Sequence, residues 1–237
     1  MIRFYAPDIQ RYGRLPEKES GHAVRVLRHR PGDTLEIVDG AGTLYRCVLL
    51  DADPKGAAVD IVEQIGLPKV WSHQLTVAVA PTKLMDRMEW LVEKLVEIGV
   101  DRIVPVLCAR SERREIKTER LEKIAVSAMK QSLKAVLPVI DGMTPLKVFL
   151  DTVPAEGRFI AWCDATSERS LLAKAYRPGT DCTVLIGPEG DFSPDEVDAA
   201  INAGYSPVTL GDNRLRTETA ALVAADTFHI INQLTSE

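Results

Sequence analysis

The feature that most constrains the fold is a repeated pattern near the C-terminus, in which a short strand-like run ends at a glycine and a helix pattern follows. Residues 183–186 form an apolar, β-branched run that stops at Gly187, and residues 207–210 form a second run that stops at Gly211. Short runs bounded by turn residues are typical of buried strands. The sequence therefore predicts two strands of one sheet, each followed by a glycine loop.

A helix is expected after each glycine loop. Ser193 is followed by Pro194 and, three residues after the serine, by Glu196, which is the pattern of a helix N-terminus with a capping box. Gly204 is placed to end that helix, and the last helix is expected over residues 217–234. Ligands of open α/β sheets bind beyond the carboxyl ends of the strands, so both loops are expected to face one ligand. Backbone N–H and C=O groups that no side chain covers suit the base edge of an adenosine-like ligand. The alternative is that the glycines of either loop only make a tight turn.

The remaining patterns predict an α/β fold in two domains. Residues 1–68 carry several short strand patterns separated by turn signals, which suggests a small β-barrel. After residue 69 strand patterns alternate with helix patterns, and this alternation indicates a parallel sheet. The helix expected over residues 86–98 carries its apolar residues on one side. We therefore predict one domain at 1–68 and a second at 69–237.

Composition and missing motifs weaken several functional classes. The net charge of −5 over 237 residues argues against indiscriminate nucleic-acid binding but leaves room for a local basic face. No apolar run has the length of a membrane span and no signal core is present, so we expect a cytoplasmic protein without membrane contact. The cysteines and histidines have no metal-ligand spacing, so no metal is expected. The strand that ends at Ala80 is not followed by G-x-G-x-x-G, and no G-x-x-x-x-G-K-[ST] occurs.

The late loops also carry a family resemblance. Gly-Pro-Glu-Gly at 187–190, Leu-Gly at 210–211 and Leu-Arg-Thr-Glu-Thr-Ala at 215–220 resemble the signature of the ribosomal RNA small subunit methyltransferase E family of the SPOUT superfamily. The resemblance covers the whole chain and implies a PUA-like β-barrel for RNA docking at 1–68. It implies a SPOUT-type parallel sheet with a trefoil knot at 69–237. It further implies S-adenosylmethionine as cofactor, methylation of N3 of a uridine in 16S rRNA of the small ribosomal subunit, and a homodimer.

The resemblance also implies the residues of the cofactor site, which we expect to act largely through backbone and apolar contacts. The cofactor-binding candidates are Ile186, Gly187, Pro188, Glu189, Gly190, Leu210, Gly211, Leu215, Thr219 and Ala220.

Arg216 and Glu218 are the catalytic candidates. Uridine N3 carries a proton, so the site must accept that proton or stabilise negative charge on O2 and O4. Arg216 stands next to a helix N-terminus, which adds partial positive charge, so it is the candidate for stabilising that charge. The alternative is that Arg216 binds only an RNA phosphate. Glu218 could be the base, although a glutamate in a first helical turn more often complements the helix dipole, and Glu189 has the same ambiguity.

Basic residues in two parts of the chain are candidate RNA contacts. They are Arg11, Arg25, Arg28, Lys83, Arg110, Lys130 and Lys134. Phosphate contacts would position the RNA and predict an affinity that falls with added salt. The chain departs from the family pattern at Asp191, where a second glycine is usual, and at Lys134, where arginine is frequent. Aspartate tolerates a positive φ better than most residues, and lysine holds a phosphate without bidentate geometry.

Three alternatives stay open from the sequence. A knotted methyltransferase acting on tRNA or on a ribose 2′-hydroxyl would share the fold. A non-catalytic RNA-binding assembly factor would have no use for both glycine loops, so cofactor binding separates it from an enzyme. A nucleotide-binding regulator is weakened by the missing phosphate motifs.

Overall fold

The structure is a computed structural model that describes residues 2–152, 156–163 and 169–235. Contacts within the chain divide it into two compact units. The N-terminal unit comprises Met1–Val70 with Val126–Leu137, and the C-terminal unit comprises Trp71–Ala125 with Pro138–Glu237. The N-terminal unit thus also takes in a later segment, which includes the second half of helix α4 (Thr118–Gln131).

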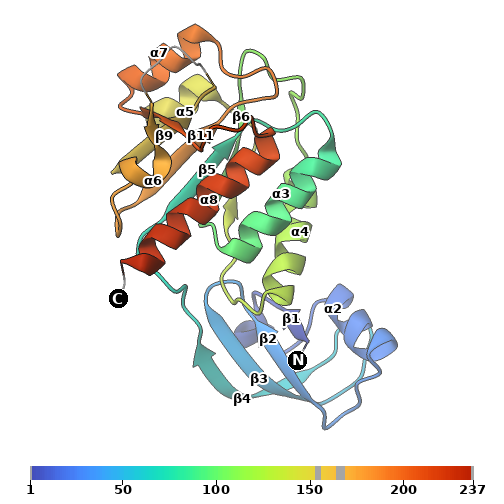
Figure 1. Ribbon diagram of the computed structural model, residues 1–237. Helices are drawn as coiled ribbons and strands as arrows, with labels where there is room; N and C mark the ends of the chain where they lie inside the picture. The colour runs from blue at the N-terminus through green and yellow to red at the C-terminus, as the bar shows by residue number, and fades with distance from the viewer. Residues whose placement is uncertain (1, 153–155, 164–168, 236–237) are drawn as a thin grey trace. The chain divides into compact units, whose positions relative to one another are not determined.

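The N-terminal unit is built on a four-stranded mixed sheet in the order β1–β2–β3–β4 (Figure 1). The first pair is parallel and the other two pairs are antiparallel. The strands are Arg3–Tyr5 (β1), Thr34–Val38 (β2), Thr43–Leu49 (β3) and Val59–Gly66 (β4). Helices Ile9–Tyr12 (α1) and Glu17–Gly21 (α2) and a π-helical turn at His22–Val26 accompany them. Alternating residues such as Leu35, Ile37, Tyr45 and Cys47 are buried, so one face of the sheet forms the core.

The C-terminal unit contains a parallel sheet in the order β10–β12–β9–β11–β5–β6–β7, with β8 paired to β6. Every pairing in it is parallel, which confirms the predicted α/β class. The strands are Leu75–Val79 (β5), Arg102–Leu107 (β6), Val139–Ile140 (β7), Thr144–Pro145 (β8), Gly157–Ala161 (β9), Ser170–Leu171 (β10), Cys182–Ile186 (β11) and Ser206–Thr209 (β12). All residues of β11 are buried, as expected of a strand covered on both faces.

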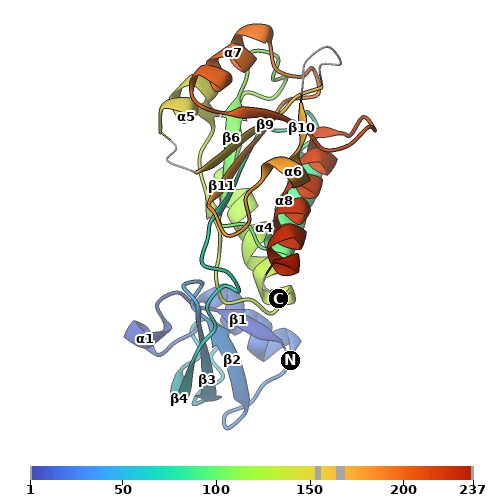
Figure 2. The ribbon, with the colours of Figure 1, turned by 60° about the vertical axis from the view of Figure 1, so that its left-hand side comes forward.

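Helices cover both faces of this sheet (Figures 1 and 2). Helices Met85–Ile98 (α3) and Thr217–Leu234 (α8) pack together, and α8 contacts β5 and β11. On the other side lie Leu146–Thr152 (α5) and Pro194–Asn202 (α7), whose apolar residues share a core with the strands. A short helix, Leu172–Ala175 (α6), also contacts α8. The bounds predicted for the last helix, and closely those for α3, are confirmed.

The predicted capping box at the start of α7 is confirmed. Ser193 Oγ accepts a hydrogen bond from the backbone nitrogen of Glu196, and Glu196 Oε2 accepts one from the backbone nitrogen of Ser193. Gly204 follows the end of this helix with a φ of +87°, a conformation that favours glycine. Over the part of the chain that the structure describes, no helix combines the length and the apolar character needed to cross a membrane.

Candidate active site

The candidate site lies at the carboxyl ends of three neighbouring strands. Strand β9 lies between β11 and β12 and runs parallel to both, so the loops after these strands emerge at one edge of the sheet. Two of them are the glycine loops that the sequence identified. The third, after β9, was not predicted, because it contains no glycine signal and its place between the other two depends on strand order.

Two adjoining hollows of about 300 Å³ and 650 Å³ form a cleft at this edge. They share lining residues from all three loops, among them Ala161, Cys163, Asp191, Leu215 and Ala220. The smaller hollow is completed by residues 186–189, Arg216 and Thr217. The larger one is completed by residues 208–213, Trp162 and Arg169. The cleft is therefore a single region with a backbone-rich part beside β11 and a more polar part beside β12.

Most predicted cofactor residues line this cleft. The smaller hollow is lined by Ile186, Gly187, Pro188 and Glu189, the larger by Leu210 and Gly211, and both by Leu215 and Ala220. Gly190 and Thr219 are not among the lining residues of either hollow. A Cβ added at Gly211 would meet no atom within 4 Å, so this glycine leaves bare backbone beside open space. Its φ of +126° favours glycine for conformational reasons as well.

Gly187 lies close against the ring of Phe192. A Cβ built there would lie 3.1 Å from two ring carbons of Phe192, so a larger residue requires the loop or the ring to move. The Gly187 carbonyl oxygen accepts a hydrogen bond of 3.1 Å from Thr217 Oγ1, at the first residue of α8. Thr217 thereby joins the two glycine loops, a role that its sequence position alone did not indicate.

Asp191, the departure from the family pattern, takes up a left-handed conformation with a φ of +61°. Its Oδ1 accepts a hydrogen bond from the backbone nitrogen of Phe192 at 2.8 Å, and its Oδ2 accepts one from the backbone nitrogen of Cys163 at 3.2 Å. A glycine could adopt the same φ but could not make these bonds. Asp191 thus ties the loop after β11 to the loop after β9.

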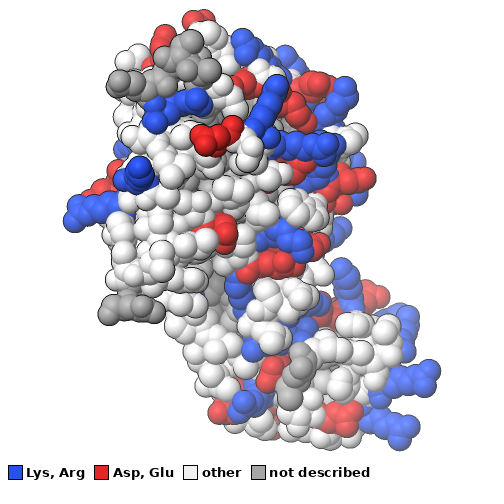
Figure 3. Space-filling view, viewed as in Figure 1, with Lys and Arg blue, Asp and Glu red and all other residues white. Residues whose placement is uncertain are grey.

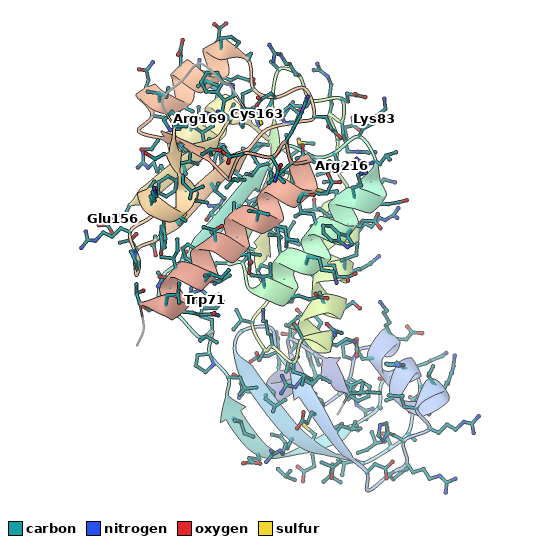
Figure 4. The ribbon with its side chains drawn as sticks, viewed as in Figure 1. Trp71, Lys83, Glu156, Cys163, Arg169 and Arg216 are labelled. Atoms are coloured by element: carbon teal, nitrogen blue, oxygen red, sulfur yellow. The ribbon has the colours of Figure 1, made fainter. Side chains whose placement is uncertain are left out.

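The two catalytic candidates lie in different surroundings. Arg216 is the N-cap residue of α8 and lines the smaller hollow with an exposed side chain (Figure 4). Glu218 is 7% exposed, lines neither hollow and lies 3.6 Å from Arg87 Nη1 of α3 in an ion pair. The arrangement brings Arg216 to the cleft but turns Glu218 toward α3.

Several predicted RNA contacts are held by bonds within the protein. Lys83 Nζ lies 2.8 Å from Glu112 Oε2, and this hydrogen bond raises the pKa of Lys83. Arg110 donates to two backbone carbonyls, and Lys130 Nζ donates to Glu19 Oε1 at 2.6 Å. Lys134 is half-buried, with its backbone nitrogen bonded to Met129. None of these four lines the cleft.

The three arginines of the N-terminal unit that the sequence suggested as RNA contacts are exposed. They are Arg11, whose guanidinium stacks on Tyr12, together with Arg25 and Arg28. On the face drawn in Figure 3, Lys and Arg interleave with Asp and Glu, in line with the absence of a strongly basic balance. Any basic face for RNA is therefore local.

The cysteines divide into three buried thiols and one exposed thiol. Burial raises the pKa of Cys47 to about 11 and that of Cys108 and Cys182 to about 12. Cys163 is exposed and lines both hollows. Among the described side chains, no cluster of three or more His, Cys, Asp and Glu residues is placed to hold a metal ion.

Known proteins resemble the chain over nearly its whole length. Residues 69–229 match an RNA methyltransferase domain family, and residues 15–62 match an RNA methyltransferase PUA domain family. Ribosomal RNA small subunit methyltransferase E of Mycobacterium bovis is 32% identical over 216 residues, which cover 87% of this chain and 81% of the relative. The crystal structure of a probable rRNA-methyltransferase from Porphyromonas gingivalis matches with a TM-score of 0.94 at 49% identity, over 99% of both chains. Ribosomal RNA small subunit methyltransferase E from Neisseria gonorrhoeae, solved with S-adenosyl methionine bound, matches with a TM-score of 0.85 at 29% identity, over 98% of both chains.

Proposed function

Because the chain belongs to the ribosomal RNA small subunit methyltransferase E family, we propose that it methylates N3 of a uridine in 16S rRNA, with S-adenosylmethionine as methyl donor. The observation that carries the proposal is the cleft beyond β9, β11 and β12, which is lined by both glycine loops and by Arg216. A protein that only bound RNA would have no need for both loops. The solved relative from Neisseria gonorrhoeae, which is bound to S-adenosyl methionine, supports the same cofactor here.

The size and chemistry of the cleft suit this cofactor. Small-molecule pockets have volumes of roughly 300–1,000 Å³, mostly apolar walls and a few fixed polar groups. Here Ile186, Pro188 and Leu215 offer apolar contact, while Gly187 and Gly211 leave backbone groups accessible. When bound, S-adenosylmethionine would supply a methyl group already activated by its sulfonium. We assign the holding and orienting of the cofactor to the predicted residues, with Gly190 and Thr219 acting from behind the lining.

We assign charge stabilisation to Arg216. Negative charge spreads onto O2 and O4 of a uridine as N3 loses its proton, and a fixed cation beside these oxygens lowers the barrier. The guanidinium of Arg216 and the N-terminus of α8, which begins at the next residue, both favour negative charge at the smaller hollow. Glu218 is buried against Arg87, so we assign it to supporting the start of α8 rather than to accepting the proton.

We assign RNA docking to the N-terminal domain at 1–68 and catalysis to the domain at 69–237. The match of residues 15–62 to the PUA domain family supports this division, and the exposed Arg11, Arg25 and Arg28 supply local positive charge. Phosphate contacts of this kind predict an RNA affinity that falls with added salt. A knotted C-terminal domain and a homodimer rest on the family resemblance, and a cytoplasmic location is the expectation from the sequence. Light scattering tests the oligomeric state.

Calorimetric titration with S-adenosylmethionine, followed by transfer of labelled methyl to small ribosomal subunits that lack the modification, tests the proposal. We expect saturable cofactor binding and label in the 16S rRNA. Label found only in tRNA, or only as a ribose methyl, would favour the alternative knotted methyltransferases. RNA binding without any cofactor binding would favour a non-catalytic assembly factor.

A further inference from the structure

The loop that follows β6, residues 108–113, contains an arginine whose contacts point inward. Arg110 Nη1 donates hydrogen bonds to the carbonyl oxygens of Gly190 at 2.9 Å and Phe192 at 3.2 Å. Both carbonyls belong to the loop after β11, which forms one wall of the cleft. The sequence suggested Arg110 as an RNA contact, and in the structure its side chain links two loops of the protein.

The aliphatic part of Arg110 also packs against the same loop. A Cβ added at Gly190 would lie 3.3 Å from Arg110 Cβ, so the bare backbone of Gly190 lies close against the arginine stem. Phe192, whose carbonyl Arg110 holds, is the residue whose ring closes over Gly187. A series of contacts thus runs from Arg110 through Phe192 to Gly187, which lines the cleft.

The loop after β11 needs support from residues outside it. Asp191 adopts a left-handed conformation between the two carbonyls that Arg110 holds, and non-glycine residues reach that conformation at a cost. The turn has an internal backbone bond from Asp191 to Pro188 at 2.9 Å. The guanidinium adds charge-assisted bonds, which are stronger than neutral ones.

Neighbouring contacts extend the same framework. Ala109 donates its backbone N–H to Glu196 Oε1 at 2.6 Å, which links the loop after β6 to the start of α7. Arg113 donates to the carbonyl oxygens of Thr82 at 3.1 Å and Lys83 at 2.7 Å, in the loop after β5. The backbone nitrogen of Lys83 in turn donates to Glu189 Oε1 at 2.9 Å. The loops after β5, β6 and β11 are therefore tied to one another in a closed set.

We propose that Arg110 is a positioning residue for the cofactor cleft, which holds residues 187–192 in the shape that binds S-adenosylmethionine. The inference rests on the proposed function, because it takes the cleft to be the cofactor site. Both bonds use Nη1, so an RNA phosphate contact through the other guanidinium nitrogens is the alternative to be separated by experiment. A positioning residue acts on the cofactor without RNA, whereas a phosphate contact acts only on RNA.

Arg110→Met removes the donors but keeps most of the aliphatic stem against Gly190. Arg114→Met is the matched control, because Arg114 is exposed in the same region and, within the described residues, its side chain makes no hydrogen bond or ion pair. Arg110→Lys keeps the charge and one donor site and serves as the rescue variant. Three measurements apply to each protein: S-adenosylmethionine affinity by calorimetry without RNA, amide hydrogen exchange of the cofactor-free chain, and RNA affinity over a range of salt concentrations.

For Arg110→Met we expect the Kd for S-adenosylmethionine to rise about tenfold, which is the ratio that one lost charged hydrogen bond typically gives. Exchange at residues 187–193 should accelerate about tenfold as well, because local opening of the loop becomes easier by the same amount. Arg110→Lys should recover part of both effects, and Arg114→Met should bind the cofactor like the wild type. The salt dependence of RNA binding should be unchanged in Arg110→Met.

Two results would overturn the assignment. One is wild-type cofactor affinity and wild-type exchange at residues 187–193 in Arg110→Met. The other is unchanged cofactor binding with a salt slope for RNA reduced by about one, the signature of a lost phosphate contact. If Arg110→Met does not fold, Arg110→Gln, which removes the charge but keeps part of the aliphatic stem, takes its place in the same comparison. The exchange measurement uses no cofactor, so a wild-type chain that fails to bind S-adenosylmethionine would contradict the proposed function while the loop-holding role is still decided.

Discussion

Gly187→Ala tests the close packing of the cleft against Phe192. An alanine Cβ would lie 3.1 Å from two ring carbons of Phe192 and 3.3 Å from its backbone nitrogen. Non-bonded carbon atoms prefer separations of about 3.5–4.0 Å, so the ring or the loop must move by roughly 0.5 Å. Phe192 is 1% exposed and shares a core with Phe149 and Tyr205, so the ring has little room. The loop therefore moves, and the cleft changes shape.

The size of the effect follows from the cost of overpacking, which is about 1–3 kcal/mol. If the cofactor must push the loop back to its original place, this cost appears in binding, and the Kd for S-adenosylmethionine rises by roughly 5- to 150-fold. Any part of this overpacking cost that is already present in the cofactor-free protein lowers the thermal unfolding midpoint instead, by about 2–4 °C per kcal/mol for a chain of this size.

Calorimetry and thermal unfolding of Gly187→Ala measure both parts. Gly142→Ala is the control, because a Cβ there would meet no atom within 4 Å, and Gly142 lines neither hollow. We expect the control to behave like the wild type in both assays. Wild-type cofactor affinity together with a wild-type unfolding midpoint in Gly187→Ala would refute the steric reasoning.

The cysteines, the capping box and the two catalytic candidates each offer a further test. A thiol reagent at pH 8 should modify Cys163 rapidly and the three buried thiols only after unfolding, since burial raises the pKa of those three from 9.0 to about 11 or 12. The stability that comes from keeping these buried thiols neutral is present below pH 9 and is lost as the pH rises toward 12, which pH-dependent urea unfolding measures. Glu196→Ala removes the side-chain half of the capping box and the bond to the loop after β6, so the free energy of unfolding should fall by about 1–2 kcal/mol, and an unchanged urea midpoint would contradict this. Arg216→Met should lower kcat by about 100- to 1,000-fold while Glu218→Gln stays within about threefold, and the opposite order would transfer the catalytic role to the glutamate.

Local signals in the sequence predicted the elements around the site well. The capping box at Ser193 and the glycine ends of the late strands depend on residues within one turn of each other. They can therefore be predicted without knowledge of the tertiary fold. The apolar side of α3, including Met88 and Leu95, is buried as the period predicted. The same local patterns located both glycine loops of the cleft.

Features that depend on tertiary arrangement were not predicted. Ala161 and Cys163 form a wall of the cleft because β9 lies between β11 and β12. Local sequence patterns do not determine this strand order. The sequence does not show whether the side chain of a basic residue also bonds within the protein, as those of Arg110 and Lys130 do. Residues 126–137 belong to the N-terminal unit because they contact residues that are distant in sequence, so local patterns did not predict this grouping either.

The proposed activity is methylation of a uridine base in the RNA of the small ribosomal subunit. The most direct measurement incubates the chain with labelled S-adenosylmethionine and unmethylated small subunits, with naked 16S rRNA and tRNA in parallel, and identifies the labelled nucleoside after digestion. We predict label in 3-methyluridine from small-subunit RNA, strongly reduced in Arg216→Met. Label confined to tRNA or to a ribose 2′-hydroxyl would contradict the proposed activity. So would the absence of label in all three RNA preparations although the protein binds the cofactor saturably.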